Sequence, residues 1–336
     1  MNEGSKPIRW GILGTAKIAT KVGEAIHRAG NAHLAGIASR GLERAQEWSR
    51  QHNADRAFGS YDDLLDDPEI EAVYIPLPPT LHGEWAIRAA EKGKHVLSEK
   101  PAEANAAETV KMTEACRACG VQFMDGVMWF HHDRTAAMRK VIDEGELGDL
   151  RSACATFSFD MGPNPGKNIR LDPGLGGGAI GDLGYYCIGA CLWAFGGLPD
   201  RVSAAGTFRH GVDMHVSGVL HYADGRNGLI DCAFDSAFRK DLDIVGNNAI
   251  LRCGHFTLPE EEDFADFEII RPSNGRSRHE FKDSVQEVRM IEHFGDAIRS
   301  GILNTKWPAR AVETMRVCDA FHESARRDME PVSLDS

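Results

Sequence analysis

An alternation of short apolar runs with helical patterns extends from Ile8 to about Val127, and it constrains the fold more than any other feature. Each apolar run is typical of a strand, and each is followed by a segment with helical periodicity. Because connections between parallel strands are right-handed, such a series predicts a doubly wound parallel sheet with helices on both faces. The expected strands are IRWGILG, HLAGIAS, AVYIPL, HVLSEK and QFMDGV, and the expected helices cover 16–30, 42–53, 80–92 and 105–119.

The pattern changes after a helix expected over 134–145. Longer alternating strands follow, and DMHVSGVLHYADGRNGLIDCAFD is typical of an antiparallel hairpin that turns at Asp224-Gly225. A glycine-rich entry leads into a helix expected over 178–195, and two further helices are expected near 284–300 and 309–327. Since 336 residues exceed what one core comfortably fills, we predict two domains. They are an α/β Rossmann domain over 1–127 and an α+β domain over 128–336.

Charge and cysteine usage exclude several classes of protein. The chain has 38 basic and 50 acidic residues, a formal net charge of -12, and the acidic residues are dispersed. This balance argues against nucleic acid or an anionic membrane as a partner. The first residues lack the apolar core of a signal peptide, and eight scattered cysteines form no disulfide framework. We therefore expect a cytoplasmic protein with reduced thiols.

A CxxC pair is the one cysteine motif. Cys116 and Cys119 lie in a helical stretch without a second pair or nearby ligand histidines, so packing is a better interpretation than zinc. We expect no metal site.

A glycine-rich motif follows the first expected strand and opens the first expected helix. This is the context that a GxGxxA dinucleotide fingerprint requires, because helix N-terminal amides then face a pyrophosphate. Ala16 stands where the second glycine of that fingerprint is usual, and a plain strand-to-helix turn is the alternative. The residues predicted to bind the cofactor here are Gly11, Gly14, Thr15, Ala16, Lys17 and Ile18.

The end of the second expected strand indicates which dinucleotide is bound. An acidic residue there usually binds the ribose of NAD, but this chain has Ser39 and Arg40. An arginine can stack on adenine and pair with a 2′-phosphate. The sequence therefore favours NADP, with NAD as the alternative.

Two loops at the carboxyl ends of later strands carry further candidates. Leu77, Pro78 and His82 are expected to line the nicotinamide side, although a histidine in a first helical turn is often only a cap. Glu99, Lys100 and Pro101 end the fourth strand, which would bring the lysine to the crevice. We expect Glu99 to orient the ammonium group and Pro101 to shape the turn, through a Lys100-Pro101 peptide that can be cis.

The glycine-rich entry of the second domain provides an acid and a phenol. Asp182 and Tyr186 are four residues apart and so share one face of a helix, whereas Tyr185 points elsewhere. Arg170 flanks the same entry as a candidate for binding substrate hydroxyls. A dipole-stabilising acid and a packed tyrosine are the alternative interpretation.

Together, GILGTAKIA, PLPPTLH, SEKP and LGGGAIGDLGYYC resemble the glucose-fructose oxidoreductase, inositol dehydrogenase and MocA-like oxidoreductases over nearly the whole chain. The similarity is greatest to the dimeric dihydrodiol dehydrogenase and NADP-dependent aldose 1-dehydrogenase branches. It implies a second domain with a large open sheet that supports a homodimer or homotetramer, and it implies no metal. It also implies a catalytic Lys100 and an acid-base residue at Tyr186. VMWFHHDRT departs from the common pattern, which makes Trp129 a candidate wall for nicotinamide or sugar; a core tryptophan is the alternative.

These residues lead to a functional hypothesis. A hydride passes between nicotinamide and a carbon of a sugar, polyol or dihydrodiol, and Tyr186 exchanges the proton. Since a phenol has an ordinary pKa near 10, Lys100 is needed as the cation that stabilises phenolate. The expected substrate contacts are Lys100, Trp129, Arg170, Asp182 and Tyr186. The alternative is a sugar sensor of the same fold that binds dinucleotide without catalysis.

Overall fold

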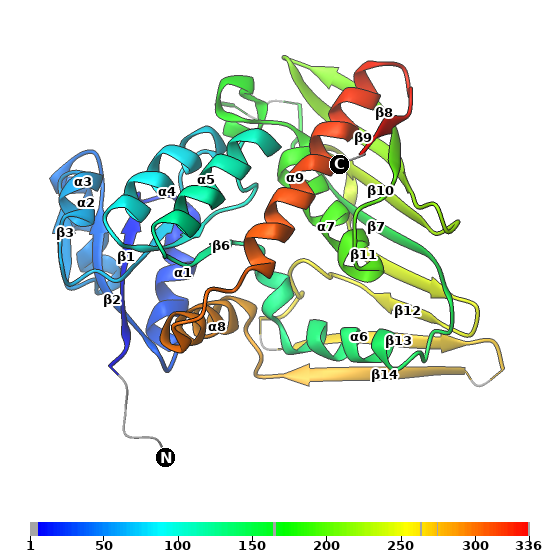
Figure 1. The fold of residues 1–336 in the computed structure, drawn as a ribbon, viewed down its shortest axis with the longest axis horizontal. Coiled ribbons are helices and arrows are strands. Elements are labelled where there is room, and N and C mark those ends of the chain that lie inside the picture. The colour runs from blue at the N-terminus through cyan, green and yellow to red at the C-terminus, as the bar shows by residue number, and fades with distance from the viewer. Residues whose placement is uncertain (1–5, 164–165, 263, 274, 335–336) are drawn as a thin grey trace. The chain divides into compact units, whose positions relative to one another are not determined.

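The computed structural model describes residues 6–163, 166–262, 264–273 and 275–334, which form two compact units (Figure 1). The first unit contains the described residues up to 103 together with 107–131 and 286–311, and the second contains 104–106, 132–285 and the described residues from 312 on. The chain enters the second unit briefly at 104–106 and leaves the first unit again after 131. Residues 286–311, which we predicted in the second domain, instead return to the first unit.

The sheet of the first unit is wholly parallel, with the strand order β3-β2-β1-β4-β5-β6. This order reverses direction between β1 and β4, as in a Rossmann fold. The predicted doubly wound sheet is confirmed, while β3 was not predicted because a three-residue strand leaves little periodicity to detect. The strands are β1 (Ile8–Leu13), β2 (Ala32–Ala38), β3 (Arg56–Phe58), β4 (Ala72–Ile75), β5 (His95–Ser98) and β6 (Phe123–Asp125).

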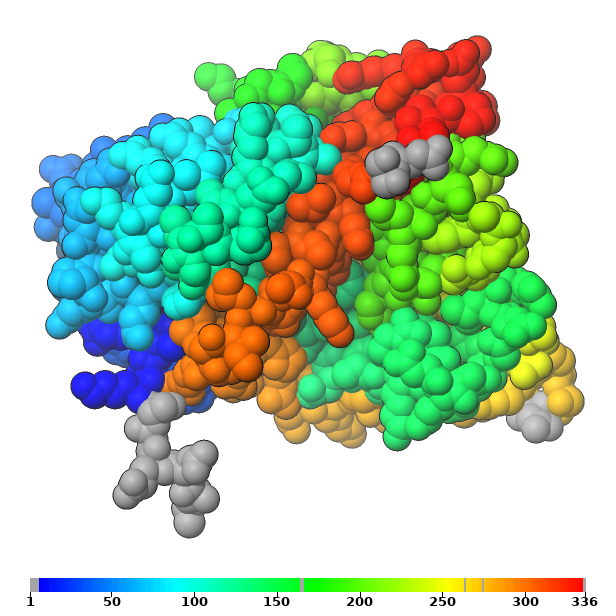
Figure 2. Space-filling view, in the orientation of Figure 1, coloured from blue at the N-terminus to red at the C-terminus, as the bar shows by residue number. Residues whose placement is uncertain are grey.

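Amphipathic helices cover this sheet. On α1 the buried positions Ala19, Val22 and Ile26 recur at the spacing of one helical face, which is why this segment packs as a helix. Helices α4 and α5 lie side by side in front of the sheet (Figures 1 and 2). The helices of this part are α1 (Lys17–Arg28), α2 (Leu42–His52), α3 (Tyr61–Leu65), α4 (His82–Glu91) and α5 (Ala106–Ala118), with short 3-10 turns η1 (Pro79–Leu81) and η2 (Met128–His131).

Helix α8 (Gln286–Ser300) completes the core of the first unit. Its buried Met290, Ile291 and Phe294 form one apolar stripe, and the Phe294 ring lies 5.3 Å from that of Trp10 in β1. Phe294 follows Trp10 by 284 residues, so the core beside β1 depends on a segment from far along the chain. Burial of this stripe is the physical reason for the return of the chain.

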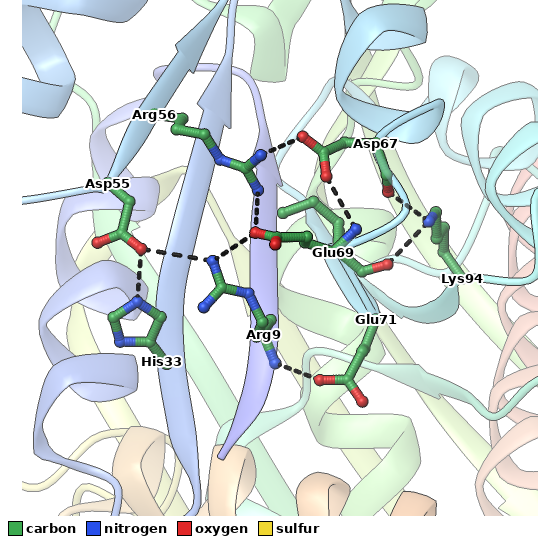
Figure 3. Close-up of polar contacts among 9 residues, drawn as sticks. Arg9, His33, Asp55, Arg56, Asp67, Glu69, Glu71 and Lys94 are labelled. Carbon is green, nitrogen blue, oxygen red and sulfur yellow. Dashed lines mark hydrogen bonds and ion pairs between the residues drawn. The ribbon is translucent and has the colours of Figure 1, made fainter. Parts of the chain in front are cut away.

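A polar network connects the amino ends of the parallel strands, at the edge opposite the carboxyl ends (Figure 3). The Arg9 guanidinium pairs with Asp55 and Glu69, and Asp55 also accepts a hydrogen bond from His33 at 2.7 Å. The ammonium of Lys94 donates to two backbone carbonyls of the loop before β4. These contacts tie together strand ends whose side chains take no part in the predicted site.

The second unit contains a nine-stranded sheet in the order β14-β13-β12-β11-β7-β10-β9-β8-β15. Among the described strands of this sheet only the β7–β10 pair is parallel, so the predicted, predominantly antiparallel sheet is confirmed, as is the β9–β10 hairpin. The strands are β7 (Leu150–Asp160), β8 (Arg201–Arg209), β9 (Val212–His221), β10 (Asn227–Ala233), β11 (Asp235–Gly246), β12 (Ile250–Cys253), β13 (Phe264–Arg271), β14 (Gly275–Lys282) and β15 (Val332–Ser333).

Helices pack on one face of this sheet. Helix α7 (Tyr185–Phe195) packs on β7 and β10, and α6 (Asp133–Asp143) packs on β13 and β14. A Cβ at Gly228 would lie 3.1 Å from Cys191 of α7, so the next residue, Leu229, points to the opposite face. Helix α9 (Lys306–Arg326) starts in the first unit and continues in the second. Within the described residues, no helix is both long and apolar enough to cross a membrane.

Candidate active site

The carboxyl ends of the parallel strands bring most of the predicted cofactor residues to one edge of the first unit. Because β1, β2, β4 and β5 run in the same direction, the segments that follow them all begin at this edge. The Gly14 turn and Ser39 follow β1 and β2, and Leu77 and Lys100 follow β4 and β5. In open α/β sheets this edge is where ligands bind, next to the strand-order reversal.

The turn after β1 has the geometry that a dinucleotide requires. Gly14 has a φ of 113°, in the region that favours glycine, and a Cβ there would lie 3.1 Å from Cδ2 of Leu77. Ala16 is the N-cap of α1, and its methyl side chain makes no hydrogen bond to the amides of the first turn. The partial positive charge of this helix end is thus left for a phosphate, and the residues present fit a dinucleotide.

Gly11 has a different explanation. It lies inside β1, where a Cβ would approach Cδ2 of Leu64 to 2.6 Å. Packing between β1 and α3 therefore accounts for this glycine without a cofactor contact.

Two arginines follow β2 instead of one, Arg40 in the loop and Arg44 in α2. Ser39 is buried and Arg40 is exposed. Burial raises the pKa of the Tyr61 hydroxyl, and the positive charges of Arg40 and Arg44 act in the opposite direction. Both guanidinium groups are therefore within electrostatic reach of one hydroxyl, which itself lies near Gly14. We missed Arg44 from the sequence, although it lies in the first turn of the helix that follows Arg40.

Glu99 acts on the backbone of the lysine that follows it. Its carboxylate accepts a hydrogen bond from the hydroxyl of Tyr74 at 2.6 Å and another from the backbone N–H of Lys100 at 3.1 Å. Tyr74 is fully buried in β4, and Lys100 is half-buried. The Lys100-Pro101 peptide is cis, as the sequence suggested. Tyr74 was missed, although a phenol within an otherwise apolar strand needs a partner and could have been noticed.

His82 holds two loops together and is not exposed at the edge. Its ring is fully buried, with Nε2 2.7 Å from the carbonyl oxygen of Leu77 and Nδ1 3.0 Å from that of Pro101. Burial lowers the pKa of His82, while the two carbonyl contacts oppose that shift. The prediction that this histidine lines the nicotinamide side is corrected, because a buried ring bonded at both nitrogens instead positions the Leu77 and Lys100 loops.

Trp129 also differs from its predicted role. The side chain is fully buried beside Phe130, with ring centroids 4.3 Å apart. An indole without exposed surface offers no wall to a nicotinamide or a sugar, so the core alternative is favoured. The tryptophan remained ambiguous in the sequence because both roles require the same large apolar ring.

The second unit holds the predicted acid and phenol at the start of one helix. Asp182 lies in a π-helical turn, η5 (Ile180–Gly184), and its carboxylate pairs with Nε of Arg170 at 2.5 Å. Tyr186 is the second residue of the regular helix α7 and is partly exposed, with its ring 5.8 Å from that of Phe157, whereas Tyr185, the first residue, is buried. A carboxylate, a guanidinium and a phenol together can bind a substrate hydroxyl and exchange a proton with it.

A buried aspartate holds the start of this helical segment. Asp213 of β9 accepts a hydrogen bond from the backbone N–H of Ile180 at 2.6 Å and another from Nε2 of His322 of α9 at 2.9 Å. Neither residue was singled out from the sequence, because their positions in an alternating strand and a helix carry no motif.

A doubly wound sheet with a glycine turn beside its switch point defines a dinucleotide-binding protein, and here it is joined to a second α+β unit. Residues 8–127 match the family described as "Oxidoreductase family, NAD-binding Rossmann fold", and residues 135–252 match the GFO/IDH/MocA C-terminal domain. The chain belongs to the GFO/IDH/MocA family of oxidoreductases.

Relatives and solved structures agree with this assignment. The chain is 35% identical to D-xylose 1-dehydrogenase (NADP(+)) 2 of Haloferax volcanii, over 94% of this chain and 97% of that one. It is 32% identical to trans-1,2-dihydrobenzene-1,2-diol dehydrogenase of Mus musculus, over 76% and 77% of the two chains. The structure matches that of KijD10, a 3-ketoreductase of Actinomadura kijaniata in complex with NADP and TDP-benzene, with a TM-score of 0.86 and 27% identity over 95% and 98% of the chains.

Proposed function

We propose that this oxidoreductase is an NADP-dependent dehydrogenase acting on a CH–OH group of a sugar, polyol or dihydrodiol, of the aldose 1-dehydrogenase or dihydrodiol dehydrogenase type. The observation that carries this proposal is the meeting of the Gly14 turn and the Glu99-Lys100 loop at one edge of the parallel sheet. The relatives D-xylose 1-dehydrogenase and trans-1,2-dihydrobenzene-1,2-diol dehydrogenase support the substrate class.

NADP is favoured over NAD by charge. Arg40 and Arg44 provide two cations after β2. The loop that follows this strand, Ser39-Arg40-Gly41, contains no acidic residue. A 2′-phosphate pairs with such cations, whereas the ribose hydroxyl of NAD requires an acceptor. The NADP named in the D-xylose relative and bound in the KijD10 structure supports the same choice.

Each of the candidate catalytic residues has a separate role in the reaction. Bound NADP supplies the hydride acceptor, and Tyr186 takes the proton of the substrate hydroxyl during oxidation. Lys100 is the cation that stabilises the phenolate, because a phenol without such a neighbour is too weak a base near neutral pH. Asp182 binds a second substrate hydroxyl, and its ion pair with Arg170 orients the carboxylate.

The test is turnover of aldoses, inositols and trans-dihydrodiols with NADP and NAD separately, measured by the absorbance of the reduced nicotinamide. Lys100→Met and Tyr186→Phe should each lower kcat by about 10²- to 10⁴-fold, the range of general acid–base catalysis. Tyr185→Phe is the matched control, since Tyr185 is the buried neighbour of Tyr186. Near wild-type turnover by either variant would refute the residue roles. Tight NADP binding by a wild-type protein without turnover on the whole panel would favour the sugar sensor.

We also propose a homodimer or homotetramer formed through the sheet of the second unit. The face opposite α7 carries Leu229, whose exposed fraction is 39%, and paired charges such as Arg252 with Asp243. An exposed apolar side chain among charges of both signs suits a self-complementary interface. Light scattering of the purified protein measures the mass, and Leu229→Glu should shift it towards the monomer.

A reducing, cytoplasmic location is part of the same proposal. All eight cysteines are free thiols, as expected of a protein that works in such a compartment.

A further inference from the structure

We infer that Asp213 and His322 form a positioning pair that sets the orientation of Asp182 and Tyr186; this inference rests on the proposed function of those two residues. The pair lies outside the substrate-binding set. Asp213 comes from β9 and His322 from α9, and both belong to the second unit.

The hydrogen bonds of Asp213 connect α9 with the beginning of the π-helical turn. One carboxylate oxygen accepts the backbone N–H of Ile180 and the other accepts Nε2–H of His322. The exposed fraction of the Asp213 side chain is only 3%, and that of His322 is 30%. A buried carboxylate that loses a partner is costly, so both bonds resist displacement of the turn.

The same carboxylate limits the backbone just before the turn. Gly178 has a φ of 131°, and a Cβ there would lie 2.3 Å from Oδ1 of Asp213. On the other side, a Cβ at Gly177 would lie 2.6 Å from the carbonyl oxygen of Arg170, which accepts the N–H of Gly178 at 2.9 Å. The segment is therefore confined between Asp213 and the residue that pairs with Asp182.

The position of the turn determines where the functional side chains lie. Asp182 is two residues after Ile180 and donates its backbone N–H to the carbonyl oxygen of Gly178 at 3.1 Å. Tyr186 follows within the same continuous helical segment. A shift of Ile180 away from Asp213 would move both side chains, and a misplacement of about 1 Å costs about 10²-fold in rate.

The pair is tested by two substitutions of the histidine. His322→Leu removes the donor to Asp213, whereas His322→Gln keeps an N–H that can reach the same carboxylate oxygen. Gly178→Ala perturbs the turn from the opposite side, by forcing a Cβ against the carboxylate. The matched control is His33→Leu, which breaks a comparable 2.7 Å histidine–aspartate bond in the first unit, far in sequence from the turn (Figure 3).

We expect His322→Leu and Gly178→Ala to lower kcat by about 10- to 100-fold for an accepted sugar or diol. The KM for NADP should stay within about twofold, because the predicted cofactor residues lie in the other unit. His322→Gln should retain most of the wild-type kcat, and His33→Leu should leave kcat unchanged. Hydrogen exchange at the peptide covering 176–186 should accelerate in His322→Leu and not in His33→Leu.

Several outcomes would overturn the inference. One is a His322→Leu variant whose kcat and hydrogen exchange are both unchanged. Another is a His322→Gln variant whose kcat is as low as that of His322→Leu. The third is a His33→Leu variant that loses as much kcat as His322→Leu. If the wild-type protein turns over no member of the panel, the proposed function fails. The exchange experiment then still decides whether the pair holds the turn, so the two failures are distinguishable.

Discussion

Replacing Arg40 by alanine is the most informative perturbation of cofactor choice. Arg40 precedes Gly41, the N-cap of α2, and its charge acts on the same Tyr61 hydroxyl as that of Arg44. A charge-assisted bond contributes about 1.5–3 kcal/mol when water is excluded and about 1 kcal/mol or less at an exposed site. Because the Arg40 side chain is exposed, we expect its contribution to lie between these two ranges, at about 1–1.5 kcal/mol. This free energy corresponds to about tenfold in binding affinity.

We therefore expect Arg40→Ala to lower kcat/KM with NADP about tenfold and to leave kcat/KM with NAD within about twofold. Arg40→Ala with Arg44→Ala should lower the NADP value by about 10²-fold, and the loss should shrink as salt is added. Arg50→Ala is the matched control, because this arginine is exposed on α2, the helix that carries Arg44, and pairs with Glu47. An unchanged NADP/NAD ratio in the double variant, or an equal loss with both cofactors, would refute the reasoning.

Three further predictions concern the first unit. Phe294→Ala should lower the free energy of unfolding by about 3–5 kcal/mol, because Phe294 is fully buried between Trp10 and the rest of the core. Urea denaturation measures this free energy. The control Leu42→Ala, at an exposed position, should change it by less than about 0.5 kcal/mol. Burial and nearby positive charge hold the pKa of His131 well below its ordinary value, so the unfolded chain binds more protons below about pH 6.5 and stability should fall on acidification by up to about 1.4 kcal/mol per pH unit. A His131→Phe variant should show a shallower pH dependence, and an unchanged slope would contradict this assignment. Tyr74→Phe leaves the buried Glu99 with one donor fewer and should cost about 1–3 kcal/mol in stability, with a lower kcat at unchanged KM for NADP if Glu99 positions Lys100.

Local signals determined the first unit well. The strand-helix alternation predicts the parallel sheet, and parallel strands necessarily place their carboxyl ends at one edge, so the Gly14 turn and Lys100 could be brought together without coordinates. The cis Lys100-Pro101 peptide was also suggested by the residue type alone. Roles that depend on burial could not be predicted from the sequence, as His82 and Trp129 show. The residue type is the same whether the side chain faces a ligand or the core.

By itself, the sequence determined the class of fold, the edge of the sheet that carries the lysine, and the arginine, Arg40, that favours NADP, since these depend on periodicity, turn residues and charge. Only the tertiary structure decided which distant segments support that edge. The Tyr74–Glu99 bond, the return of α8 to the core beneath Trp10, and the Asp213–His322 pair behind Ile180 all join residues with no regular spacing in the chain. Contacts between distant segments are set by how whole elements pack, and no periodicity within a single element encodes them.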